Sequence, residues 1–155
     1  MRRKKSLSLL EILLSVSLLS VSLGGVGFQI HKILKQDRFE KSASLILEKI
    51  LFAKECSANF GTDITLLLSQ KKEGLSCVMT SSSPLMNQEK WLLAQDKFFD
   101  TISSFSLNGE NRERLKIQIT NGGRIEKRGI LQLNMKDKSV DIVLSQKPKR
   151  VSKLS

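Results

Sequence analysis

The stretch LSLLEILLSVSLLSVSLGGVGFQI, residues 7–30, constrains the fold of this chain more than any other. Its only charged residue is Glu11, and a basic block, Arg2-Arg3-Lys4-Lys5, comes just before it. Residues 12–30 carry no charge, and as a helix they would measure about 28 Å, close to the thickness of a bilayer core. We therefore expect a membrane-spanning helix over 7–30, with the basic block cytoplasmic and the rest of the chain on the far side. A carboxylate in such a segment costs free energy, so Glu11 is expected to have a function.

The helix is expected to continue past this stretch. From His31 onward, apolar residues recur at helical spacing with charged residues between them, which predicts an amphipathic continuation over 31–60. Asn59 and Gly61 are typical of a helix C-terminus. A helix from Leu9 to Asn59 would be about 75 Å long, far more than a small globular domain requires. The residues expected to face the core are Phe39, Ala43, Ile46, Leu47, Ile50, Ala53 and Phe60.

After Gly61 the hydrophobic period approaches two, which predicts strands. Turn signals separate them, among them Asn108-Gly109 and the run Asn121-Gly122-Gly123. Residues 81–100 have no pattern that assigns them to an element. One long helix followed by antiparallel strands predicts an α+β fold, with the helix laid on an antiparallel sheet formed by a β domain over 61–145. The expected strands are 63–69, 75–80, 102–107, 115–120, 130–135 and 140–144.

The start of the chain resembles the processing site of type IV prepilins and of the pseudopilins of type II secretion. In that family a short basic leader is cut before a hydrophobic residue, and the fifth mature residue is glutamate. Here 1–6 corresponds to the leader, Ser6 and Leu7 flank the cut, and Glu11 matches the acid. Ser6 departs from the family, which usually has glycine there. The resemblance implies cleavage by a prepilin peptidase, N-methylation of Leu7, and pairing of Glu11 with the Leu7 amine of a neighbouring subunit.

Later segments are similar to H-type minor pseudopilins and related minor pilins. In 39–68 a helix with a small-residue end is followed by Gly61 and a strand, and 129–144 resembles the family's paired late strands. The major pseudopilin has a calcium-binding C-terminal loop, and no comparable cluster of Asp and Asn occurs here, which favours a minor subunit. The resemblance implies a pilin-like fold and a structural role in a periplasmic pseudopilus that helps export proteins across the outer membrane.

That resemblance also implies a location and partners. The protein would be a single-pass inner-membrane protein with a cytoplasmic N-terminus and a periplasmic C-terminal domain. Its partners would be other pilin or pseudopilin subunits, the prepilin peptidase, the inner-membrane assembly platform and membrane lipid.

Small residues form a stripe in the apolar stretch. Ser17, Ser20, Gly24 and Gly27 are spaced three, four and three apart, so they fall on one helix face. Such a face lets transmembrane helices approach closely, which predicts packing against a neighbouring subunit's helix. The alternative is that each serine simply bonds to its own helix backbone.

Positive charge is concentrated at the two ends of the chain. Of the net charge of +11, the four leader cations and the tail cations Lys147, Lys149, Arg150 and Lys153 account for eight. A solvated, disordered basic tail over 146–155 is the simplest interpretation. The alternative function uses this tail: a minor type IV pilin, in pilus assembly or DNA uptake, would bind DNA through these four residues.

Catalysis is not indicated. The only histidine, His31, stands at the end of the apolar stretch, and no phosphate loop or metal-ligand spacing occurs. We therefore expect no enzyme activity, no metal and no cofactor. Cys56 and Cys77 are the only cysteines. A periplasmic location permits a disulfide between them, and two separate buried thiols are the alternative.

Overall fold

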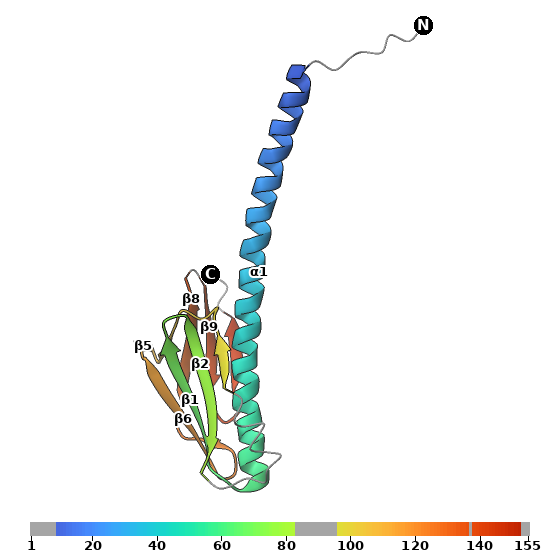
Figure 1. Ribbon diagram of the computed structural model, residues 1–155. Helices are drawn as coiled ribbons and strands as arrows, with labels where there is room; N and C mark the ends of the chain where they lie inside the picture. The colour runs from blue at the N-terminus through green and yellow to red at the C-terminus, as the bar shows by residue number, and fades with distance from the viewer. Residues whose placement is uncertain (1–8, 83–95, 137, 153–155) are drawn as a thin grey trace. The chain divides into compact units, whose positions relative to one another are not determined.

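A computed structural model describes residues 9–82, 96–136 and 138–152 (Figure 1). The chain divides into two compact units, residues 1–37 and 38–155, and each is described by itself. The first contains the N-terminal part of the single long helix α1, Leu9–Phe60. The second contains the remainder of α1 and two antiparallel sheets of five strands each.

The helix α1 ends at Phe60, one residue beyond the predicted end at Asn59. Gly61 follows the last helical residue with φ 61°, the left-handed conformation that commonly ends a helix and that glycine adopts without steric cost. Glu11 lies in the first turn of the described part of α1.

The first sheet has the strand order β3-β2-β1-β6-β7. In the hairpin of β1 and β2 the register places Leu68 opposite Cys77. On the other side of β1, β6 is paired with Leu66 opposite Ile117. Alternate residues are buried at Ile64, Leu66 and Leu68 of β1 and all along β6, where the apolar–polar alternation of the sequence predicts it. The strand bounds are β1 Ile64–Lys71, β2 Gly74–Ser81, β3 Lys97–Phe99, β6 Arg114–Thr120 and β7 Arg124–Ile125.

The second sheet has the strand order β10-β9-β8-β4-β5. Its centre is the predicted hairpin of β8 and β9, aligned by Leu131↔Ile142. β4 pairs with β8 through Phe105↔Leu133, so the core-facing apolar residues of three strands share one face. The strand bounds are β4 Ser104–Leu107, β5 Glu110–Asn111, β8 Gly129–Met135, β9 Lys138–Leu144 and β10 Lys149–Ser152.

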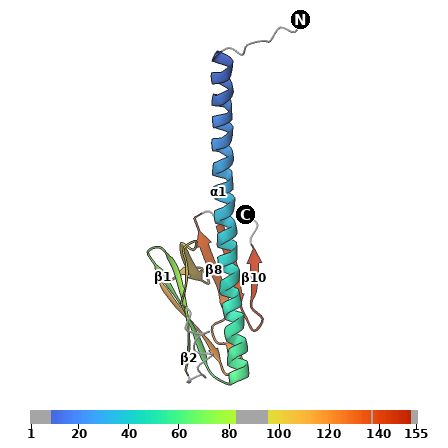
Figure 2. The same ribbon diagram turned by 45° about the vertical axis from the view of Figure 1, so that its right-hand side comes forward.

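One core joins the C-terminal part of α1 to both sheets. The helix contributes a stripe at spacings of three and four residues, and these side chains are fully buried: Phe39, Ala43, Ile46, Ile50 and Ala53. Figure 2 shows this part of α1 running alongside the sheets. Two residues that were predicted to face the core are not fully buried. Leu47 is only partly buried because it stands about 100° from Ile46 around the helix, and Phe60 is 47% exposed at the helix end.

All six predicted strands are present, but the prediction of about six strands was too low. The described residues form ten strands in two sheets, and the additional ones, β3, β5, β7 and β10, have two to four residues each. The predicted disordered tail is also wrong for Lys149–Ser152, which form β10. This strand pairs along the edge of β9, so its backbone groups are satisfied by the sheet.

Gly74 offers a test of the packing of β3 against the hairpin. A Cβ at this position would lie 2.3 Å from the Phe99 carbonyl oxygen, and φ is +155°. Because backbone atoms cannot move aside as a side chain can, Gly74→Ala is expected to lower the free energy of unfolding by about 2 kcal/mol. Gly109→Ala is the control: φ is +85°, but nothing lies within 4 Å of the added Cβ. Urea denaturation of both variants would measure the difference, and equal losses would contradict this packing.

Candidate functional site

Glu11 lies in a helical segment with apolar side chains on every side. The side chain of Glu11 is exposed, and Leu9, Leu10 and Leu13 are 78%, 69% and 63% exposed. Successive residues point about 100° apart around a helix, so these side chains, together with Ile12 and Leu18 at 51% and 61% exposed, cover its whole circumference. A helix that is apolar all round needs an apolar surrounding, either other helices or lipid.

The small-residue stripe lies in the same unit. The Ser17 hydroxyl donates to the Leu14 carbonyl at 2.8 Å, and the Ser20 hydroxyl donates to the Val16 carbonyl at 2.8 Å. These are the local bonds of the alternative interpretation. They also satisfy each hydroxyl without an outside partner, so the stripe can lie against an apolar surface at little cost. Packing along this stripe therefore stays a prediction.

Other predicted site residues are located as follows. Gly24 and Gly27 lie within α1. Ser6, Leu7 and Lys153 lie outside the described residues, so the predicted processing site and the last tail cation are not part of the structure. Within the described ranges, no helix has a stretch long and apolar enough to cross a membrane.

Cys56 and Cys77 are both buried and are not joined by a disulfide, which corresponds to the second of the two alternatives predicted from the sequence. Cys56 lies on α1 and is 9% exposed, while Cys77 on β2 is completely buried. Burial raises the pKa of the Cys77 thiol to about 11, with Lys49 lowering it and Asp96 raising it by smaller amounts. The thiol is therefore protonated at neutral pH and is a poor nucleophile.

The C-terminal segment is attached to α1 by two cations. Arg150 on β10 contacts the Glu40 carboxylate at 3.2 Å, and it donates to the Ser44 hydroxyl at 3.1 Å and to the Glu40 carbonyl at 3.3 Å. Lys54, further along the helix, donates to the Gln146 carbonyl. We call these contacts of Arg150 and Lys54 the C-terminal latch.

The latch changes the interpretation of the predicted anion contact. Lys147 and Lys149 are exposed, but the guanidinium of Arg150 is occupied by α1. Sequence reasoning missed the partners Glu40 and Ser44, because they precede Arg150 by more than a hundred residues and resemble other polar residues of the helix surface. The available signal was the spacing of Glu40 and Ser44 by four residues, which puts both on one helix face.

Arg150→Gln is expected to loosen β10 while leaving the rest of the domain folded. Glu40 is half-exposed, so the ion pair and hydrogen bonds together should contribute about 1 kcal/mol, and exchange of the β10 amide protons should rise about fivefold. Lys149→Gln, on the same strand with an exposed side chain, is the control and should change little. Unchanged exchange in Arg150→Gln would show that the latch does not hold β10.

No group of three or more His, Cys, Asp or Glu side chains in the described part of the chain is placed to hold a metal ion. His31 is exposed on α1.

Comparison with known proteins yields no relative: no family model matches the chain, and no curated protein or solved structure is significantly similar to it. The class that the structure defines is therefore a general one, an α+β protein whose long N-terminal helix packs on two antiparallel sheets. Any narrower identity depends on the residues and geometry described above.

Proposed function

We propose that the protein is a minor pseudopilin, a structural subunit of a type II secretion pseudopilus. The observation that carries this proposal is the composition of α1. One continuous helix of 52 residues begins with an all-round apolar segment with Glu11 in its first turn, and it ends with a stripe buried against the sheets. Such a helix can serve two purposes at once: its start joins a membrane or a helical filament core, and its end carries a folded domain.

Glu11 supplies the assembly step in this proposal. Cleavage between Ser6 and Leu7 creates a new α-amino group, which remains cationic after methylation. The Glu11 carboxylate of an incoming subunit pairs with that amine on a neighbour. In an apolar surrounding an unpaired carboxylate is strongly penalised, and a matched cation relieves the penalty. The pair therefore favours one axial register between subunits.

The proposed topology follows from the uncharged length of the N-terminal segment. Residues 7–30 cross the inner membrane with the basic leader in the cytoplasm, and the β domain faces the periplasm. The prepilin peptidase and the assembly platform act on this segment. Lipid surrounds it before assembly, and the helices of other subunits surround it afterwards.

The latch argues against the alternative, a minor pilin that binds DNA with its tail. DNA affinity depends on the number of cations free to contact phosphate. Arg150 is already engaged by Glu40 and Ser44, and β10 keeps Lys149 within a sheet. In a structural role the contacts of Arg150 instead hold β10 to α1.

Co-expression with a type II secretion machinery tests the proposed function. The chain should appear with the other pseudopilins in the sheared filament fraction, and deleting its gene from a native operon should reduce secretion. A chain that remains in the membrane fraction, with unchanged secretion, would contradict the proposal. Secretion that is unchanged while transformation by DNA is lost would support the alternative function instead.

Cross-linking tests the proposed packing face. Ser17→Cys and Ser20→Cys should form dimers through the introduced thiols at least about fivefold more readily than Ser15→Cys, which stands about 160° from the centre of the stripe. The control is closely matched, since Ser15 is also an exposed serine that bonds to its own helix, at the Glu11 carbonyl. Equal cross-linking at all three positions would rule out a preferred packing face.

A further inference from the structure

The strand β6 has one edge that is only partly paired. β1 pairs with it from Arg114 to Ile119, but on its other side β7 pairs only with Ile119 and Thr120. The Gln118 carbonyl accepts from the Glu126 amide at 3.0 Å. Among the described residues, the earlier part of this edge has no strand beside it (Figure 1).

The backbone direction along β6 shows which groups this edge presents. In an antiparallel ladder the N–H and C=O of one residue point to the same side, and the side alternates along the strand. The Glu113 carbonyl accepts from Gln70 on β1, and the Gln118 carbonyl faces β7. The N–H and C=O groups of Arg114 and Lys116 therefore point away from β1, toward the unpaired edge. Each of these two residues therefore offers one hydrogen-bond donor and one acceptor to an added strand.

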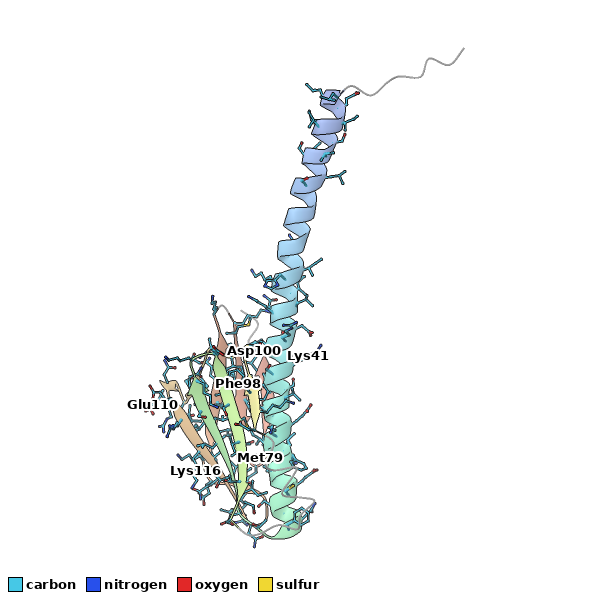
Figure 3. The ribbon with its side chains drawn as sticks, in the orientation of Figure 1. Lys41, Met79, Phe98, Asp100, Glu110 and Lys116 are labelled. Carbon is cyan, nitrogen blue, oxygen red and sulfur yellow. The ribbon has the colours of Figure 1, made fainter. Side chains whose placement is uncertain are left out.

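The side chains at this edge are cationic. Arg114 and Lys116 are exposed on the outer face of the sheet, while Leu115 between them is buried (Lys116 is labelled in Figure 3). Directly across on β1 stand Ser69 and Leu67, which carry no charge.

Among the described residues, the acids nearest in sequence form no ion pair with Arg114 or Lys116. Glu113 and Glu126 are exposed, at the start of β6 and after β7. Glu110 on β5 pairs with Arg112 at 2.8 Å. Within the described part of the chain, neither Arg114 nor Lys116 forms an ion pair. Their charge is therefore available to a ligand.

We propose that the free edge of β6 binds an extended acidic segment of a partner protein by β-strand addition. The segment adds a strand beside residues 114–117, and its carboxylates, at alternate positions, lie next to Arg114 and Lys116. This inference does not depend on the function proposed above, because it uses only the β domain.

Two other occupants fit the edge less well. A second copy paired edge to edge would bring Arg114 and Lys116 next to their own counterparts, and like charges opposite one another are destabilising. A nucleic acid would meet backbone carbonyls as well as amides, and carbonyls do not bind phosphate. The exposed aromatic Phe98 cannot help stack bases here, because β3 is three strands away from β6 in the sheet order.

The test uses short peptides and the full chain, isotope-labelled in detergent micelles. The probe is an eight-residue peptide of high strand propensity with glutamate at alternate positions, and its control has glutamine there. Titration should shift the Arg114 and Lys116 amide signals, and the glutamine peptide should bind about fivefold more weakly, since each charge pair across a ladder contributes a few-fold in affinity. Equal binding of the two peptides would overturn the proposal.

Backbone N-methylation separates strand addition from simple charge attraction. Methyl groups on the glutamate nitrogens block an antiparallel added strand, and methyl groups on the intervening nitrogens block a parallel one, while the charge stays the same. One of the two methylated peptides should therefore lose at least about tenfold in affinity. If both bind like the parent peptide, or if a DNA oligonucleotide displaces it from these amides, the proposal is wrong.

Charge reversal provides the matched variants. Lys116→Glu should weaken the acidic peptide about tenfold and allow binding of a peptide with lysine at the alternate positions. Lys97→Glu changes another exposed cation, on the edge strand β3 at the other side of the sheet, and should leave binding unchanged. If both variants lose affinity to the same extent, the attraction reflects net charge alone and the proposed edge site is contradicted.

Discussion

Glu11→Ala is expected to abolish filament assembly while membrane insertion stays normal. The substitution removes a charge from an apolar helix, so insertion becomes easier. Assembly loses its carboxylate partner, and the methylated amine of the neighbour is left unpaired at a cost of about 3–5 kcal/mol. The amount of the chain in the sheared filament fraction should fall at least about tenfold, while the amount that resists alkaline extraction from membranes stays the same.

Two control variants make the Glu11 result specific. Glu11→Asp keeps the charge and should retain part of the assembly, whereas Ser15→Ala changes a polar residue one turn later and should retain all of it. The Ser15 hydroxyl donates to the Glu11 carbonyl within its own helix. If Glu11→Ala assembles as well as Ser15→Ala, the acid has no role in contacts between subunits.

Ile50→Ala is expected to cause the largest loss of stability. Ile50 is fully buried at the centre of the helix stripe that packs on both sheets, and its truncation should lower the free energy of unfolding of the domain by about 3–4 kcal/mol. Leu51→Ala is the matched control: the next side chain on the helix is 41% exposed and should cost less than about 1 kcal/mol. Hydrogen exchange of the sheet amides would measure both values.

The pair of variants also tests which face of α1 is docked. The helix is apolar at both positions, so sequence alone does not rank them. A larger loss for Leu51→Ala than for Ile50→Ala would mean that the helix packs on the sheets through a different face.

Elements with a strong hydrophobic period could be predicted from the sequence. The helix ended at the left-handed Gly61, and β6 followed the clean alternation of Leu115, Ile117 and Ile119. Short edge strands could not be predicted in the same way. β5 and β7 have two residues each, too few for any period, and β10 depends on an edge of β9 that only the tertiary structure creates.

The candidate site shows the same division between local and long-range signals. Glu11 stands out locally, because it is the only charge in a long apolar stretch. The role of Arg150 was not predictable from local sequence, since its partner Glu40 stands 110 residues earlier in the chain. The edge of β6 was also missed. The apolar–polar alternation placed Lys116 on the outer face. However, only the pairing in the sheet shows that β7 is too short to cover the earlier part of this edge.

The central claim is that this chain is processed and assembled as a pilin-like subunit, and its N-terminus tests that claim most directly. The measurement is the N-terminal sequence and intact mass of the membrane-purified protein, with and without a prepilin peptidase. With the peptidase, the account predicts a chain that starts at Leu7 and carries one additional methyl group on its nitrogen. An intact leader under both conditions would contradict it, because neither the amine partner of Glu11 nor the proposed assembly step would then exist.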